Sequence, residues 1–196
     1  MMTQTSRTTP SAPADKPALS KAVRYALDGA HTHVGFSVRH LMISNVRGEF
    51  RTVSGEASFA PDRPQDTTLS VSIDVASIHT GEEQRDAHLR SADFFDAEKF
   101  PTLTFVSKGV RPRDDGLDVE GELTIHGTTR PVTLAVEELT PERTDPWGNK
   151  RIGATARTKI RRSDFGMTWN AAIEAGGVLV GDDVKIEIEA ELIRKD

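Results

Sequence analysis

The sequence contains no cysteine among its 196 residues. Disulfide bonds, thiolate zinc sites and a cysteine nucleophile are therefore excluded. It also lacks any apolar run close to the roughly 20 residues that a membrane-spanning helix needs. Positive charge is not in excess, because the formal net charge is −5. This balance argues against a protein that coats nucleic-acid phosphates and against a surface made to adhere to anionic lipid head groups.

The first twenty residues contain few large apolar side chains. The stretch MMTQTSRTTPSAPADKPALS has no apolar segment of the about 7–15 residues that a secretory signal requires. We expect residues 1–20 to form a disordered arm and residues 21–196 to form one domain. The simplest location is the cytoplasm, and a missing leader would make the protein periplasmic or secreted.

Alternation of apolar and polar residues dominates the chain from residue 23 onward. In TTLSVSIDV every second residue from Leu69 to Val75 is apolar, and LDVEGELTI, PVTLAVE and VKIEIEAEL alternate in the same way. A period of two predicts antiparallel strands with one dry and one wet face. Turn-forming stretches such as DDG, HGTT and DPWGN separate about eight such segments.

The stretch IHTGEEQRDAHLRS interrupts this alternation. Thr80 followed by Glu83 fits a capping box, which predicts a short helix from about Gly81 to Arg90. The sequence therefore predicts an all-β fold with one or two short helices.

The strand-forming segments are numerous enough to close on themselves. An open antiparallel sheet of this size would leave exposed edges, whereas a barrel of about eight strands has none. Its interior is just wide enough for its own side chains or for one slender ligand. In RIGATARTKI, the small residues Ala154, Ala156 and Thr158 share one face. They favour a hollow interior, and large residues on the opposite wall are the alternative that would fill it.

Three of the six histidines lie in HTHVGFSVRH, residues 31–40. His31 and His33 share one face of an extended strand, whereas His40 has the opposite parity and lies about 23 Å further along. Metal ligands approach one ion to about 2.0–2.1 Å, so these three cannot share a site unless the chain bends sharply. Two interpretations of His31 and His33 stay open. Either they bind a metal together with a distant carboxylate, or they lie at a polar rim near Asp28.

Sequence signatures of catalysis are scarce. There is no G-x-S-x-G nucleophile elbow, and no Gly-rich phosphate loop or dinucleotide fingerprint follows a strand. Acidic pairs such as Asp114 and Asp115 lie at turns, which is typical of solvated surface. We therefore expect no catalytic residues, no resident metal and no cofactor.

Four stretches together resemble a known family. They are YALDGAHTHVGFSVRHLMISNVRGEF, SIHTGEEQRDAHLRSADFFDAEKFPTLTFVS, GELTIHGTTRPVTL and RSDFGMTW. From about Tyr25 to Leu192 the sequence resembles the YceI-like family of lipid-binding proteins. The resemblance implies an elongated, lipocalin-like antiparallel β-barrel whose pore takes an extended polyisoprenoid or isoprenoid quinone. It also implies a homodimer, and a periplasmic location from which this sequence departs because it shows no signal peptide.

The expected function is non-enzymatic binding of an isoprenoid lipid, for carriage, storage or protection. The expected partner is that lipid, with no nucleic acid and no stable membrane insertion. Two alternatives stay open: a metal-assisted enzyme that uses His31 and His33, and a stress-response interaction protein whose pore is incidental.

The parity of the strands predicts which side chains bind the ligand. A prenyl chain has no hydrogen-bonding groups, so its site needs dry area more than polar chemistry. His40 is the one polar candidate, either as a core histidine or as a contact for a head group. The predicted ligand-binding residues are Phe36, Val38, His40, Leu69, Val71, Ile73, Phe105, Leu123, Ile125, Leu134, Ala154, Ala156, Met167, Trp169 and Ile186.

Overall fold

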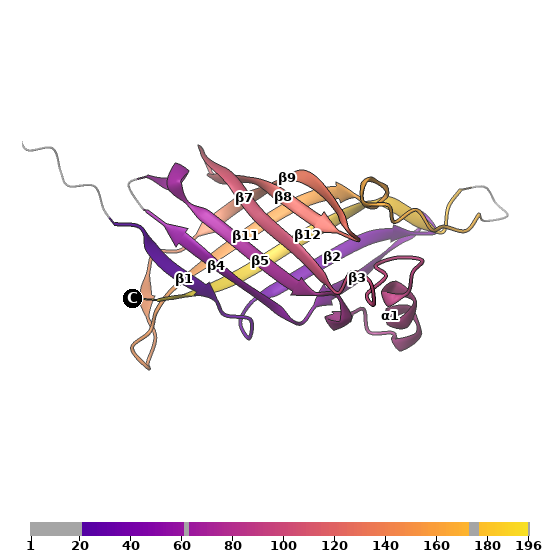
Figure 1. Cartoon of the computed structure of the whole chain (residues 1–196), viewed down its shortest axis with the longest axis horizontal. Coiled ribbons are helices and arrows are strands. Elements are labelled where there is room, and N and C mark those ends of the chain that lie inside the picture. The colour runs from indigo at the N-terminus through magenta and orange to yellow at the C-terminus, as the bar shows by residue number, and fades with distance from the viewer. Residues whose placement is uncertain (1–20, 61–62, 173–176, 196) are drawn as a thin grey trace, which may run out of the picture.

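The computed structural model describes residues 21–60, 63–172 and 177–195. These residues form an antiparallel β-barrel with a single α-helix, which confirms the expected fold class (Figure 1). The arm predicted for residues 1–20 lies outside the described residues. No helix in the described part of the chain has the length and apolar character needed to cross a bilayer.

Strands account for most of the described residues, and short helical segments join some of them. The strands are β1 (Val23–Leu27), β2 (His33–His40), β3 (Ser44–Phe50), β4 (Val53–Phe59), β5 (Thr68–Asp74), β6 (Ile78–His79), β7 (Thr102–Arg113), β8 (Gly116–Ile125), β9 (Thr128–Leu139), β10 (Arg143–Thr144), β11 (Lys150–Arg161) and β12 (Val180–Arg194). The helix is α1 (Glu83–Arg90), and the 3-10 segments are η1 (Pro64–Asp66), η2 (Val75–Ser77) and η3 (Arg162–Phe165).

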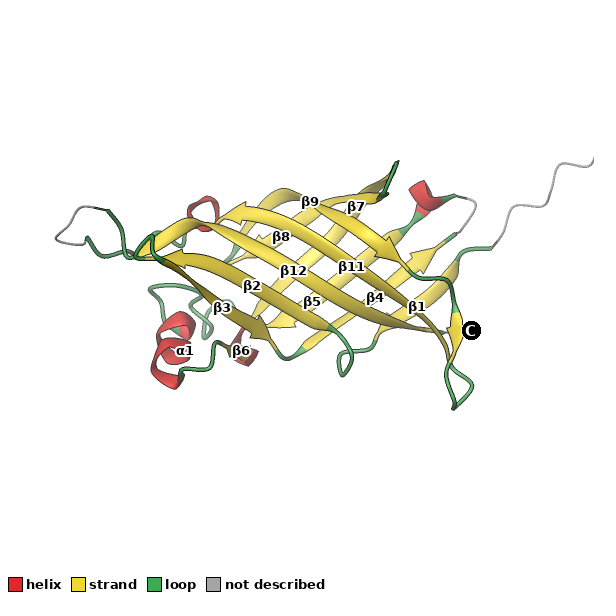
Figure 2. Cartoon of the chain, turned by 180° about the vertical axis from the view of Figure 1, so that it is seen from behind, coloured by secondary structure: helices red, strands yellow, loops and turns green. Residues whose placement is uncertain are grey.

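The barrel closes because β12 is paired along both of its edges. One edge pairs with β11 from Asp183 to Ile193, and the other pairs first with β2 and then with β1. The order β11-β9-β8-β7-β5-β4-β1-β12 returns to β11 and forms a ring of eight strands. β2 and β3 prolong β1 and β4 toward the end of the barrel that carries α1 (Figure 2). We call this the α1 end, and the opposite end the C-terminal end.

The period of two in the sequence decides which side chains point inward. On β11 the inward residue Ala156 lies beside Ile188 of β12 and Val136 of β9. Three apolar clusters follow one another along the inside of the barrel. One surrounds the buried ring of Phe165 at the α1 end, one contains Phe105 and Ala156, and one contains Leu192 near the C-terminal end.

The capping box predicted for the helix is wrong. The N-cap is Glu82, whose carboxylate accepts hydrogen bonds from the backbone N–H groups of Gln84 (3.0 Å) and Arg85 (2.7 Å). The Thr80 hydroxyl instead donates to Asp86, whose carboxylate also accepts the Thr80 backbone N–H at 2.9 Å. Asp86 is buried, and a buried carboxylate is costly without hydrogen-bond donors. Thr80 therefore donates to Asp86 instead of capping the exposed first turn of the helix.

Gly121 on β8 is required by the close approach of β7. A methyl group at this position would lie 2.6 Å from the carbonyl oxygen of Val106 and would overlap the ring of Phe105. Gly109 on β7 is the opposite case, because a methyl group there would meet no atom within 4 Å. The two glycines therefore form a matched pair for testing the packing of the barrel wall.

We predict that Gly121→Ala lowers the free energy of unfolding by about 1–3 kcal/mol, since the added methyl group forces β7 or the Phe105 ring to move. Gly109→Ala should change it by less than about 0.5 kcal/mol. Urea denaturation of both variants measures the difference. Equal stabilities would contradict the packing described for β7 and β8.

Candidate functional site: an apolar cavity inside the barrel

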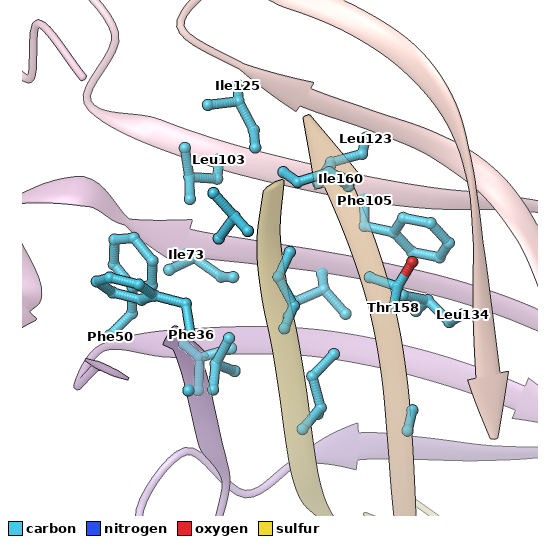
Figure 3. Close-up of a pocket in the computed structure, with 18 of the residues that line it drawn as sticks. Phe36, Phe50, Ile73, Leu103, Phe105, Leu123, Ile125, Leu134, Thr158 and Ile160 are labelled. Carbon is cyan, nitrogen blue, oxygen red and sulfur yellow. The ribbon is translucent and has the colours of Figure 1, made fainter. Parts of the chain in front are cut away.

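The barrel encloses a cavity with a volume of about 240 Å³. Its lining residues come from every strand of the ring, and Figure 3 shows ten labelled side chains that surround it. Along β12 alone, lining residues run from Val180 to Leu192. At roughly 3.3 Å per residue this is about 40 Å measured along the strand. The cavity is therefore long, and its walls are the inward faces of alternating strands.

The lining is almost entirely apolar. Among the described residues that form it, just Thr32, Thr158 and Arg162 have side chains with a polar group. The Thr32 hydroxyl is already engaged near the C-terminal end, where it accepts a hydrogen bond from the backbone N–H of Glu191 at 3.2 Å. Thr158 lies on β11 among the side chains of Figure 3. A wall of this kind recognises a ligand by excluding water rather than by hydrogen bonding.

Arg162 is the charged group of the lining, and it is buried at the α1 end. Its guanidinium donates to four backbone carbonyls: those of Gly181 (2.9 Å), Met167 (2.6 Å), Trp169 (2.9 Å) and Val180 (3.3 Å). Burial lowers the pKa of Arg162, and the nearby Asp182 carboxylate opposes that shift. An arginine stays protonated in proteins, so this end of the cavity carries a positive charge held by neutral carbonyls.

Most of the predicted ligand-binding residues lie in the cavity wall. Those that line it are Phe36, Val38, Leu69, Val71, Ile73, Phe105, Leu123, Ile125, Leu134, Ala154, Ala156, Met167 and Ile186. Whether they bind a ligand stays a prediction, because lining is a matter of geometry alone.

The other two predicted residues, His40 and Trp169, lie outside the lining. His40 is the last residue of β2, pairs with Ser44 and Val180 at the rim, and does not itself line the cavity. Trp169 follows η3 and packs its ring against His88 (4.7 Å) and Phe94 (5.2 Å) instead. Strand parity does not apply to Trp169, which lies outside the strands, and along β2 it does not tell where the cavity ends.

Sequence reasoning missed further lining residues of two kinds. Val34, Ile160 and Ile188 share the parity of residues that were predicted, and the same alternation could have found them. Leu89, Phe94 and Phe95 come from α1 and the loop after it, where no period of two exists. The burial of Arg162 could not be predicted either, because the sequence shows two adjacent arginines and the fold decides which of them is buried.

The two histidines considered for a metal site pair with different carboxylates. The His31 Nδ1 atom lies 2.9 Å from Asp28, whereas His33 Nδ1 lies 3.2 Å from Glu49 of β3. Potential ligand atoms of Asp28, His31 and Glu191 do lie within 4.8 Å of one another. The position of a cation between the two carboxylates is nevertheless taken by Arg151, whose Nη1 lies 2.7 Å from Asp28 and 2.6 Å from Glu191.

Arg151 is the centre of an ionic network on the outer face of the C-terminal end. Besides Asp28 and Glu191, its guanidinium contacts Asp145 at 2.7 Å. The hydrogen bond from Arg151, together with His31, lowers the pKa of Asp28 to about 2. Burial opposes the shift at Asp145, but hydrogen bonds from Asn149 and Arg151 hold its pKa well below the usual range. The network links the β1–β2 loop, the β10–β11 turn, β11 and β12, so it holds this end of the barrel together.

Comparison with known proteins identifies a matching family model. The model of the YceI-like domain matches residues 25–192. Protein YceI of Salmonella newport is 40% identical over 149 residues, which are 75% of this chain and 78% of that protein. A UPF0312 protein of Vibrio vulnificus is 40% identical over 152 residues, or 76% of this chain and 80% of the relative.

Solved structures share the same architecture. Burkholderia cenocepacia BcnA superposes with a TM-score of 0.72 at 24% identity, covering 84% of this chain and 98% of BcnA. The Campylobacter jejuni YCEI protein gives 0.67 at 34% identity, with 80% and 90% covered. A polyisoprenoid binding domain from Saccharophagus degradans gives 0.62 at 17% identity, with 88% and 99% covered.

We predict that Arg151→Met lowers the melting temperature by several degrees at neutral pH, because three carboxylates lose their shared cation. The pKa of Asp28 is lower in the folded state than in the unfolded chain. The ionised Asp28 carboxylate therefore contributes fully to the stability of the fold above its ordinary pKa of 3.8, and this contribution is lost as the pH falls toward about 2. The difference from the wild type should therefore shrink across that window.

Thermal unfolding monitored by circular dichroism as a function of pH measures this effect. Arg157→Met is the matched control, since Arg157 is 63% exposed and pairs with Glu137 at 3.0 Å. It should change the melting temperature little. A constant difference between wild type and Arg151→Met at every pH would contradict the role given to Asp28.

Proposed function

Because the chain belongs to the YceI-like family, we propose that it binds an isoprenoid lipid in the barrel cavity and carries, stores or protects it. The ligand class is a polyisoprenoid or an isoprenoid quinone. The observation that carries this proposal is the length of the cavity together with its almost wholly apolar lining. The Saccharophagus degradans protein of the same fold is a polyisoprenoid binding domain, which supports the same ligand class here.

The energetics of a prenyl chain suit this wall. Such a chain gains roughly 0.8 kcal/mol for each CH₂ group removed from water. Part of that gain offsets the ordering of the chain and the loss of its free motion. A ligand that extends along the barrel buries more groups than a compact one of the same size. A long, flexible hydrocarbon is therefore favoured over a small, polar molecule.

The polar groups near the cavity support binding rather than a chemical step. Arg162 is held by four carbonyls at fixed positions, and Thr32 is engaged with the backbone of β12. His31 and His33, the residues of the alternative enzyme hypothesis, pair with carboxylates on the outer face and are absent from the cavity lining. We infer a carrier without catalytic activity, and no specific observation favours the stress-response alternative.

The direct test is the recovery of a bound lipid. Protein produced in bacteria should retain a prenyl lipid that appears in an organic extract analysed by mass spectrometry. Native mass spectrometry of the same sample should show the added mass, and it tests the predicted homodimer as well. A folded protein that neither retains nor takes up any prenyl lipid under several conditions would rule the proposal out.

We predict that Ala156→Trp reduces prenyl-lipid uptake about tenfold or more while the protein stays folded. Ala156 is an inward residue of β11 that lines the cavity, so an indole ring there fills the space of the chain. Lys159→Trp is the matched control, because Lys159 points outward on the same strand and its side chain is 59% exposed. Titration with a fluorescent prenyl analogue measures uptake, and circular dichroism checks the fold.

If Ala156→Trp does not fold, Ala154→Phe places a smaller blocking ring on the same wall two residues earlier. Uptake equal to that of the wild type in a folded blocking variant would show that the chain does not lie against β11.

A further inference from the structure

The turn between β2 and β3 has an unusual backbone for its sequence. Leu41 and Met42 have φ values of 50° and 60°, and the Ile43 N–H donates to the His40 carbonyl at 3.0 Å. This is the φ pattern of a type I′ turn, which favours Asn and Gly because bulky side chains are strained at positive φ. The β8–β9 turn follows the rule, since Gly127 takes one of its two left-handed positions.

The strained turn displays large apolar side chains to solvent. Met42 is 56% exposed and Ile43 is 77% exposed. Val178, which is 41% exposed, lies on the neighbouring segment, and the Leu41 N–H joins the two segments by donating to the Leu179 carbonyl at 2.8 Å. We call Met42, Ile43 and Val178 the apolar tip. Hairpin turns are normally polar, so an exposed apolar cluster held by a strained turn indicates a surface that meets an apolar partner.

The charge of the β2–β3 hairpin differs from that of the whole chain. Residues 39–48 include Arg39 and Arg47 but no Asp or Glu, although the chain has a formal net charge of −5. The acidic pair near the start of β12 is engaged by other groups, since Asp182 accepts hydrogen bonds from Ser163 and Asp183 pairs with Lys159. Apolar side chains flanked by arginines fit the interface of a phospholipid bilayer, where the former enter the acyl region and the latter meet phosphates.

The apolar tip lies directly beyond one end of the cavity wall. Val38 and Val180 line the cavity, and Val180 pairs with His40, the last residue before the turn. A prenyl lipid resides in membranes, so a protein that carries one must meet a bilayer to collect or release it. We propose that the apolar tip docks the α1 end of the barrel reversibly onto a phospholipid bilayer for this exchange. The inference rests on the proposed function, because the cargo explains the need for docking.

Vesicle binding by the full chain tests the proposal. The protein is mixed with vesicles of equal parts phosphatidylcholine and phosphatidylglycerol, and the bound fraction is measured by sedimentation. The double variant Met42→Gly, Ile43→Thr should lower the affinity about tenfold or more, because two apolar side chains leave the bilayer. Its melting temperature should be unchanged or higher, since glycine relieves the strain at position 42. A loss of binding then cannot be ascribed to unfolding.

Two control variants remove exposed apolar side chains elsewhere. Val106→Thr alters the barrel wall, where Val106 is 43% exposed, and Trp147→Ser alters the β10–β11 turn at the C-terminal end, where Trp147 is 82% exposed. Both should bind vesicles as the wild type does. An equal loss in Trp147→Ser, unchanged binding in the double variant, or no binding by the wild type would overturn the proposal. So would a dimer in solution that the double variant abolishes, because the apolar tip would then be covered by a second copy.

Uptake of a prenyl quinone from two sources separates this inference from the proposed function. From detergent micelles, the wild type and the double variant should take up the quinone equally. From vesicles, the double variant should load about tenfold more slowly. Equal loading from vesicles would overturn docking as the route of exchange, whereas no uptake from micelles by either protein would overturn the proposed function itself.

Discussion

The pairing of β12 along both edges is the interaction on which the rest of the structure depends. β12 holds β11 on one side and both β1 and β2 on the other, and this converts a sheet into a ring. Once the ring is closed, the inward positions face one another across the cavity. The same alternation that makes an open sheet amphipathic therefore produces an enclosed apolar space. The barrel and its cavity thus both follow from the alternation of apolar and polar residues and from the pairing of β12 along both edges.

This dependence explains how much could be predicted from the sequence. The period of two gave the strands, and residues such as Phe36, Ala156 and Ile186 do lie in the cavity wall. His40 and Trp169 do not, because their positions are set by the rim and by the packing around His88 and Phe94. Leu89 of α1 and the loop residues Phe94 and Phe95 reach the cavity through tertiary packing, for which a single sequence has no periodic signal. Parity is a local property, whereas the ends of a barrel are made by segments distant in sequence.

Two arginines show how the fold assigns opposite environments to the same side chain. Arg151 is surrounded by Asp28, Asp145 and Glu191, so its positive charge is more than balanced. It holds these three carboxylates together on the outer face of the barrel. Arg162 is held by four backbone carbonyls and has the Asp182 carboxylate nearby. Its hydrogen bonds tie the segment after η3 to the start of β12. Neither role is visible in the sequence, since each depends on which partners the barrel brings near.

The closure by β12 also has a consequence for how the chain folds. β1 and β12 are neighbours in the barrel, yet Tyr25 pairs with Arg194, so nearly the whole described chain lies between the two partners. Contacts of such long sequence separation form late and slow the folding of β proteins to roughly milliseconds or seconds. Until β12 docks, the inward faces of the earlier strands are uncovered and can pair with other unfolded chains. The apolar wall that suits a lipid is thus also the surface by which an unfinished barrel would aggregate.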